Sequence, residues 1–215
     1  MPDNLKSQVI ERSNKFEGAA EIVALHLRHV LRRSRLFAPL VVPTRIFSRV
    51  KDPKSIFRKI TQKKRDGLHF NTARDVENHI NDLAGARLVC DYLSDVTFIH
   101  GYLQRHPAFK VLRGKTEDYI AHPRNGYRGV HMVVEVQTSF GRARCEIQLR
   151  TMLQHAWAEK SHDLLYKLGK TDLRRVPKQI RTLMEQQSNL LYNIDTMALE
   201  IANLVRQSQR RAAMR

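Results

Sequence analysis

The chain has 215 residues, of which 42% are hydrophobic, so it is long and apolar enough to bury the core of one domain with flanking helices. It carries 38 Lys and Arg against 21 Asp and Glu, which gives a formal net charge of +17. This excess indicates polyanionic partners: nucleotide phosphates, RNA or an anionic membrane surface. A merely soluble basic surface is the alternative.

The sequence also indicates a compartment. No secretory signal stands at the N-terminus and no apolar run approaches the length of a membrane span, so we expect a cytoplasmic protein without a membrane partner. Cys90 and Cys145 each lie in an apolar run typical of a strand. That placement favours two buried thiols over a disulfide or a metal pair, and therefore a reducing environment.

The first 37 residues have the apolar spacing of a helix, which we interpret as a packing or assembly arm. An extended segment from Leu40 then leads into Lys51-Asp52-Pro53. Asp before Pro predicts a helix start, because Asp caps free backbone N–H groups and Pro suits the first helical position. Helix N-termini bind phosphate, so Lys51, Ser55 and Lys59 form a candidate triphosphate site, with a solvated basic helix as the alternative.

Asp82 stands at the mouth of a second predicted strand, which contains the apolar run Leu88-Val89-Cys90. A carboxylate in this place is typical of a metal ligand, and a capping aspartate is the alternative. Gly85 permits close approach of the backbone to a ligand. Residues 113–128 are polar and rich in turn residues, and Tyr127 follows an Asn-Gly turn, where its ring can face a base or pack at a rim.

The most informative pattern is a hairpin. Apolar and polar residues alternate from Val130 to Val136 and from Ala143 to Leu149, with a turn at 139–141. If odd positions of one strand pair with even positions of the other, four polar side chains share a face: His131, Glu146, Gln148 and Arg150. Solvent is the ordinary environment of such a face, but a carboxylate, an amide and an arginine in successive positions indicate a site.

The C-terminal part predicts a long amphipathic helix. Apolar residues recur at three- and four-residue spacing from Ile180 to Leu204, and a basic tail follows. So long a stripe needs a partner, either the catalytic core or another subunit. The sequence has no Walker-type phosphate loop, dinucleotide glycine pattern or zinc-ligand spacing.

Taken together, these segments resemble the synthetase domain of RelA/SpoT-type alarmone synthetases, most closely the small single-domain members. The resemblance covers roughly residues 44 to 167. Its motifs are Ser48-Arg49-Val50-Lys51 with Ser55 and Lys59, Asp82-Leu83-Ala84-Gly85-Ala86-Arg87, Asp118-Tyr119-Ile120, Asn125-Gly126-Tyr127-Arg128 with His131, and Glu146-Ile147-Gln148-Leu149-Arg150-Thr151 with His162, Tyr166 and Lys167. Each motif alone is weak, and the ordered series is specific.

The resemblance implies an α+β fold: a mixed β-sheet flanked by helices, related to nucleotidyltransferases, with helical N- and C-terminal extensions. The expected organisation is a helical arm at 1–40, the synthetase domain at 41–170, and an amphipathic helix with a basic tail at 171–215. The implied reaction transfers the β,γ-pyrophosphate of ATP to the 3′-hydroxyl of GDP or GTP with Mg²⁺, as in the stringent response. Small synthetases commonly form tetramers through terminal helices, so a homo-oligomer is expected.

The resemblance also assigns residues to two halves of a site. On the ATP half, Arg49 and Arg87 would sandwich the adenine, and Lys51, Ser55 and Lys59 would hold the phosphates. Asp82 would ligate Mg²⁺, and Glu146 would share the metal or activate the acceptor hydroxyl. On the acceptor half, Tyr127 would stack on guanine. The other residues assigned to the guanine nucleotide are His131, Gln148, Arg150, Arg124, Lys115 and His155.

Three departures from the family pattern fall on the acceptor half. Glu117 stands where a Lys or Arg usually precedes Asp-Tyr-Ile, a charge reversal that Lys115 would offset. The loop at 123–125 is one residue shorter, which leaves Arg124 in place of a lysine. Ser161 stands where small synthetases often carry a glutamate. The ATP half is therefore the firmer assignment.

Two alternatives remain open. A toxin-like relative would move pyrophosphate from the same ATP site onto the 3′ end of tRNA, which suits the net charge of +17 and the basic tail. A non-catalytic RNA-binding module would have kept only the fold. The presence of both Asp82 and Glu146 argues against the second alternative.

Overall fold

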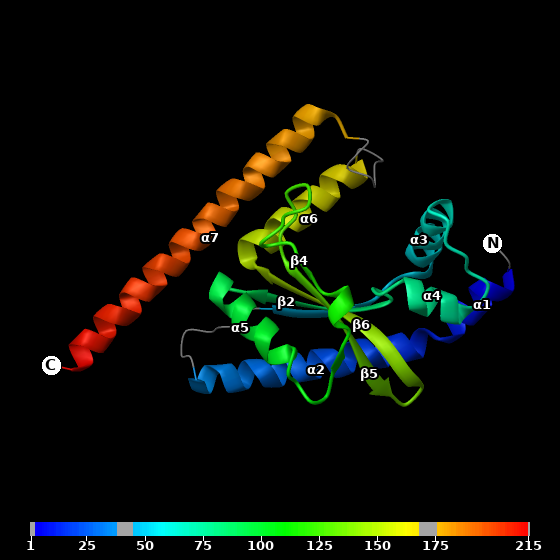
Figure 1. The fold of residues 1–215 in the computed structure, drawn as a ribbon, viewed down its shortest axis with the longest axis horizontal. Coiled ribbons are helices and arrows are strands. Elements are labelled where there is room, and N and C mark those ends of the chain that lie inside the picture. The colour runs from blue at the N-terminus through cyan, green and yellow to red at the C-terminus, as the bar shows by residue number, and fades with distance from the viewer. Residues whose placement is uncertain (1–2, 38–44, 168–175, 215) are drawn as a thin grey trace.

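The computed structural model describes residues 3–37, 45–167 and 176–214, and it arranges helices around one sheet (Figure 1). The helices are α1 Asp3–Glu11, α2 Ser13–Phe37, α3 Pro53–Arg65, α4 Ala73–His79, α5 Leu93–Leu103, α6 Met152–Lys167 and α7 Lys178–Ala213, with a 3-10 helix η1 at Arg113–Lys115. The strands are β1 Arg45–Val50, β2 Ala84–Cys90, β3 Lys110–Val111, β4 Glu117–Asp118, β5 Val130–Thr138 and β6 Gly141–Thr151. Within these ranges, none of the helices combines the length and apolar character that crossing a membrane requires.

The described strands form one mixed sheet in the order β1-β2-β6-β5-β3, with β4 also paired to β5. Strands β2 and β6 run parallel, and the other pairs are antiparallel. In the β5–β6 hairpin, His131 pairs with Gln148 and Val133 with Glu146. Odd positions therefore pair with even ones, so the predicted hairpin register is confirmed and the polar residues share a face.

The opposite face of the sheet forms the core. Helix α2 runs beneath the sheet (Figure 1), and Val23 and Leu27 on it are fully buried in the same cluster as Cys145, Ile147 and Leu149 of β6. The N-terminal helical segment thus packs on the sheet of its own subunit. Cys90 is also buried, and both thiols are free, as predicted. Burial raises the pKa of both thiols and keeps them protonated.

Helix α7 rises alongside α6 and also contacts α5 (Figure 1). Its inner side buries Met184, Ser188, Asp195 and Ala202. Most of the predicted apolar stripe instead faces outward; its exposed members are Leu183, Leu190, Ile194, Met197, Ile201 and Leu204. The expected boundaries after residues 40 and 170, and the extended segment at 40–44, lie outside the described residues.

Candidate active site

A cavity of about 720 Å³ opens on the polar face of the sheet. Its walls come from β1, the start of α3, β2, β6, α6 and α7. Ten of the predicted site residues line it: Arg49, Lys51, Ser55, Asp82, Arg87, Tyr127, Glu146, Gln148, Arg150 and His155. The sheet register explains this convergence, because Gly85 of β2 pairs with Arg49 on one side and with Glu146 on the other. The missing side chain at Gly85 leaves the floor open between them.

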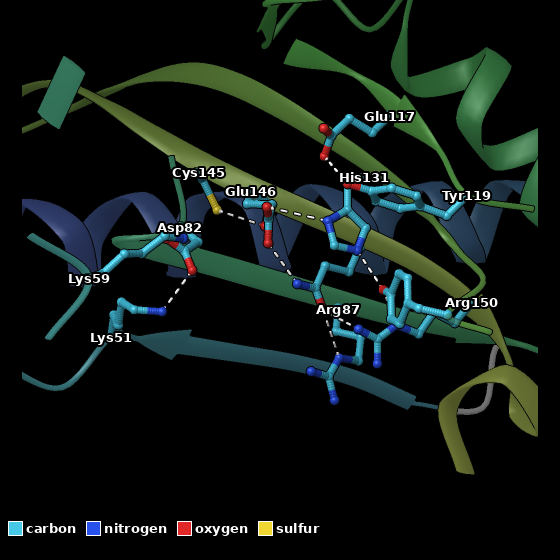
Figure 2. Close-up of polar contacts among 12 residues, drawn as sticks. Lys51, Lys59, Asp82, Arg87, Glu117, Tyr119, His131, Cys145, Glu146 and Arg150 are labelled. Atoms are coloured by element: carbon cyan, nitrogen blue, oxygen red, sulfur yellow. Dashed lines mark hydrogen bonds and ion pairs between the residues drawn. The ribbon is translucent and has the colours of Figure 1, made fainter. Parts of the chain in front are cut away.

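One end of the cavity holds a cluster of charges around Asp82 (Figure 2). Lys51 Nζ donates to Asp82 Oδ2 at 2.7 Å, and Lys59 Nζ donates to Asp82 Oδ1 at 2.8 Å. Burial alone would raise the pKa of Asp82, but the two ammonium groups outweigh it and hold that pKa at about 2. The carboxylate is therefore ionised throughout the physiological pH range.

The start of α3 forms as the sequence predicts. Asp52 is the N-cap, its side chain accepts from the Ser55 backbone N–H at 2.9 Å, and Pro53 opens the helix. Ile56 and Ile60 are buried, which anchors the helix against the core. Ser55, on another side of α3, lines the cavity at the positive end of the helix dipole.

The outward residues of β6 make a continuous polar ladder. Gln148 Nε2 donates to Glu146 Oε2 at 2.6 Å, and an Arg150 guanidinium N–H donates to Gln148 Oε1 at 3.0 Å. From β2, Arg87 Nε donates to the same Gln148 oxygen at 3.2 Å, and its Nη1 lies 2.7 Å from Glu159 Oε1 on α6. His155 Nδ1 is 3.4 Å from the same Arg87 nitrogen. Gln148 therefore couples the β2 arginine to the Glu146 carboxylate.

A second chain of contacts links Arg150 to Glu146 through the predicted acceptor residues (Figure 2). Arg150 Nε donates to the Tyr127 hydroxyl at 2.9 Å, and that hydroxyl lies 2.5 Å from His131 Nε2. His131 Nδ1, on the other side of the ring, lies 3.4 Å from Glu146 Oε1. Arg150 also stands over the Tyr127 ring, with its guanidinium carbon 4.9 Å from the ring centroid.

These contacts set the charge of Glu146. Burial raises the pKa of this carboxyl, but the contacts with His131 and Gln148 lower it further than burial raises it, so the net pKa lies below the ordinary value. Glu146 and Asp82 are thus both ionised and both line the cavity, and the negative charge of Asp82 raises the pKa of Glu146 slightly. Two carboxylates beside an open cavity fit Mg²⁺, which takes one or two carboxylates together with phosphate and water oxygens.

Four predicted site residues are not among those that line the cavity. Lys59 and His131 contact two residues that do line it, Asp82 and Glu146 respectively. Lys115 Nζ instead donates to the Asn78 carbonyl and to Asn81 Oδ1, and Arg124 is exposed in the loop before β5. Glu117 contacts the Tyr119 hydroxyl rather than a cation. The side chains of Tyr166 and Lys167 lie outside the described ones.

Several lining residues were not singled out from the sequence as site residues: Phe47, Arg58, Trp157, Glu159 and Met184. Phe47 has a signal, because it alternates with Arg49 along β1 and so shares its face. Glu159 also has one, since it follows His155 by four residues, one helical turn. Met184 has none, because its place in the wall depends on how α7 packs.

The mixed sheet with an ionised carboxylate pair and a lysine cluster at a helix N-terminus defines a nucleotide-transferring enzyme of the synthetase type. The family described as the region found in RelA/SpoT proteins matches residues 48–171. The chain therefore belongs to the RelA/SpoT family. Its fold is the expected α+β arrangement, with a mixed sheet between helices and helical termini.

Known relatives agree with this assignment. The chain is 31% identical to the GTP pyrophosphokinase YwaC of Bacillus subtilis over 159 residues, 72% of this chain and 71% of that one. It is 30% identical to the GTP pyrophosphokinase YjbM of the same organism over 169 residues, 76% and 74% of the two chains.

Solved structures show the same likeness. The small alarmone synthetase 1 of Bacillus subtilis superposes with a TM-score of 0.74 at 26% identity, covering 89% of this chain and 94% of that one. A GTP pyrophosphokinase family protein of Streptococcus pneumoniae superposes with a TM-score of 0.75 at 26% identity, covering 93% and 95%.

Proposed function

We propose that this protein is a GTP pyrophosphokinase, an alarmone synthetase that transfers the β,γ-pyrophosphate of ATP to the 3′-hydroxyl of GDP or GTP. The relatives YwaC and YjbM bear the name of that activity, and one solved structure with the same fold holds its product pppGpp. The observation that carries the proposal is one cavity with a lysine–aspartate cluster at one end and the Glu146–Tyr127–Arg150 network at the other.

The Asp82 end is the ATP half. Lys51 and Ser55 present an ammonium group and a helix N-terminus to the cavity, which suits the phosphates. Asp82 pairs with both Lys51 and Lys59. When ATP enters, the two lysines exchange a carboxylate for phosphate oxygens. Arg49 and Arg87 stand further along the same wall, where planar guanidinium groups would cover the adenine.

Asp82 and Glu146 are the residues that would hold Mg²⁺. Bound there, the metal supplies charge neutralisation for the phosphates and a fixed template for the transferred group. The carboxylate of Asp82 becomes available for this role because its two lysines turn to the phosphates. Mg²⁺ held by these two carboxylates would take its other ligands from phosphate and water.

The Glu146 end is the acceptor half. The lowered pKa of Glu146 makes it a weak base, so its main role is to orient the 3′-hydroxyl and the metal rather than to hold a proton. Tyr127 presents its ring to the cavity for guanine, and Arg150 and His131 fix the orientation of that ring. Gln148 and His155 complete the wall on this side.

In the reaction the acceptor 3′ oxygen bonds to the β-phosphorus of ATP, and the bond from that phosphorus to the oxygen bridging the α-phosphate breaks. AMP leaves, and the hydroxyl proton passes to water. The transition state spreads negative charge over the phosphoryl oxygens, so positioned cations contribute most of the catalysis. Lys51, Lys59 and the arginines of the wall supply them.

Arg124 and Lys115 keep their proposed place with the acceptor phosphates. Their role requires the 113–124 part of the 113–128 segment to bring them toward the cavity when a guanine nucleotide binds, since Lys115 is engaged with Asn78 and Asn81. Loops of this kind commonly order around a substrate.

The proposal extends to cytoplasmic localisation and to a homo-oligomer, a tetramer, built through the terminal helices. The exposed apolar face of α7 supports assembly, because Leu190 is 64% and Leu204 64% exposed on a helix of 36 residues. Sedimentation equilibrium would give the mass of the assembly, and a monomer at all concentrations would contradict it.

tRNA is the second candidate acceptor. The observation that favours it is the basic last turn of α3, where Lys63, Lys64 and Arg65 follow one another. Neutralising them should flatten the salt dependence of tRNA binding, and an unchanged slope would exclude this patch.

The proposed activity is tested by incubating the protein with ATP, Mg²⁺ and GDP or GTP. AMP and a guanosine 3′-diphosphate should appear in equal amounts. Release of ADP, or of AMP without a guanosine product, would contradict the assignment.

A further inference from the structure

The inner face of α7 is polar where it meets the rest of the subunit. Ser188 and Asp195 are 4% and 3% exposed, whereas large apolar residues of the same helix face outward. Their spacing of seven residues, with Met184 one turn before Ser188, places all three on one side of the helix. Such an interface adds directional hydrogen bonds to the apolar contacts of Met184 and Ala202, and these bonds fix how α7 is placed.

The first set of these bonds reaches the segment that carries Tyr127. The Ser188 hydroxyl donates to the Gly126 carbonyl. Arg128 donates one N–H to Asn189 Oδ1 at 2.9 Å, and its guanidinium carbon lies 4.2 Å from the centre of the Tyr192 ring. Both residues that flank Tyr127 in the chain are therefore held by α7.

Gly126 shows how closely these parts fit. Its φ is +81°, and a Cβ built on it would stand 2.8 Å from Trp157 Cζ2 and 3.3 Å from the Glu185 backbone of α7. Trp157, in turn, donates its indole N–H to the Met184 carbonyl at 3.1 Å. The loop, α6 and α7 thus meet in a contact with no spare volume.

The second set reaches the end of β6. Thr151 Oγ1 lies 2.6 Å from Asp195 Oδ2. The same Thr151 accepts from the Gln154 backbone N–H and donates its own N–H to Gln154 Oε1, so it caps α6. Asp195 therefore fixes the junction between Arg150, the last polar residue of the ladder, and the helix that carries His155.

We propose that α7 is a positioning element for the acceptor half of the site, with Ser188 acting on Tyr127 and Asp195 acting on Arg150. The inference rests on the proposed function and adds to it an intrasubunit role for the C-terminal helix. Lys51 follows β1, Lys59 lies on α3 and Asp82 lies in the segment before β2. The hydrogen bonds of α7 described above instead reach α6, the end of β6 and the 126–128 segment. Loss of these hydrogen bonds raises KM for the guanine nucleotide and leaves KM for ATP nearly unchanged.

The test compares Ser188→Ala and Asp195→Ala with Gln187→Ala, a matched control at an exposed neighbouring position. Each of the first two should raise KM for GDP about tenfold and KM for ATP less than twofold, because each leaves a buried partner without its hydrogen bond. Asp195→Asn should recover most of the loss, since its amide oxygen still accepts from Thr151. Equal rises in both KM values, or none for GDP, would overturn the proposal.

Trp157 supplies an independent readout, because it is the only tryptophan in the chain and is 5% exposed. Its emission should shift to longer wavelength in Ser188→Ala and stay unchanged in Gln187→Ala. If the intact protein transfers no pyrophosphate, the proposed function fails, and the positioning role is then decided by equilibrium titration. A GDP Kd that is the same in the intact protein and in Ser188→Ala contradicts it, and a weakened GDP Kd with an unchanged ATP Kd upholds it.

Discussion

Lys51 Nζ lies 2.7 Å from Asp82 Oδ2, in a pair where both side chains are mostly buried. Lys59 completes the cluster from α3, so one carboxylate holds two cations at the end of the cavity. Two positive charges gathered around a single negative one leave a net positive site, which is suited to the phosphates of ATP. The two lysines proposed to bind phosphate are therefore paired with the residue proposed to bind the metal.

Removing one of these cations should weaken ATP binding. For Lys51→Met we expect KM for ATP to rise ten- to a hundredfold, because a hydrogen bond to a charged group contributes roughly 1.5–3 kcal/mol. KM for GDP should change little. Lys54→Met, at the exposed second residue of α3, is the control and should behave as the intact protein. Steady-state kinetics with each substrate varied in turn measure both KM values. A larger rise in KM for GDP than in KM for ATP would reverse the assignment of the two halves.

Neutralising Glu146 should stop the reaction without unfolding the protein. Glu146→Gln keeps the shape and still accepts from Gln148, but it removes the charge, and we expect the rate of transfer to fall by about 10²-fold or more. Glu135→Gln is the matched control: it lies on β5 outside the cavity wall and pairs with Lys110 and Arg144. Circular dichroism would confirm the fold of both variants. Transfer retained in Glu146→Gln would remove this residue from the site.

The ring and the hydroxyl of Tyr127 have separable roles. Tyr127→Ala should raise KM for GDP or GTP much more than KM for ATP, since stacking on a base is worth roughly 1–3 kcal/mol. Tyr127→Phe keeps the ring and loses only the link between Arg150 and His131, so its effect should be smaller. If the two variants were equally impaired, the hydroxyl rather than the ring would be the functional group.

Asp195 should make stability depend on pH. Burial raises its pKa from 3.8 to about 6, although the Thr151 hydrogen bond acts in the opposite direction. Between these two pKa values the folded protein binds more protons than the unfolded chain. The contribution of Asp195 to the free energy of unfolding therefore falls as pH rises from about 4 to about 6, and it is constant above that range. Asp195→Asn lacks this titration. Thermal unfolding of both proteins is measured across pH 4.5–7. The Tm of the intact protein minus the Tm of Asp195→Asn should fall as pH rises, and a constant Tm difference would contradict the raised pKa.

The sequence predicts the strand-borne part of the site well. Alternation in β5 and β6 is enough to place His131, Glu146 and Gln148 on one face, and the Asp-Pro signal is enough to begin α3. Both are local patterns with fixed geometry.

Local sequence patterns do not predict contacts between residues that are far apart in the chain. Asp82 and Lys51 are 31 residues apart, and nothing in their spacing shows that they meet. On α7 the sequence leaves two partners open for the apolar stripe, the catalytic core or another subunit, and in the structure Ser188 and Asp195 are buried while Leu190 is exposed. Hydrogen bonds to the 126–128 segment and Thr151 hold the Ser188 and Asp195 side against the rest of the chain, and residue spacing along the helix does not show such bonds.

We propose that pyrophosphate is transferred from ATP to a guanine nucleotide within this cavity. The most direct measurement offers γ-³²P-labelled ATP and Mg²⁺ to the purified protein with GDP, GTP or deacylated tRNA in separate reactions, and follows the label. We predict labelled guanosine 3′-diphosphates with GDP and GTP, and none with Glu146→Gln. Label that reaches only tRNA, or only inorganic phosphate, would contradict transfer of pyrophosphate to a guanine nucleotide.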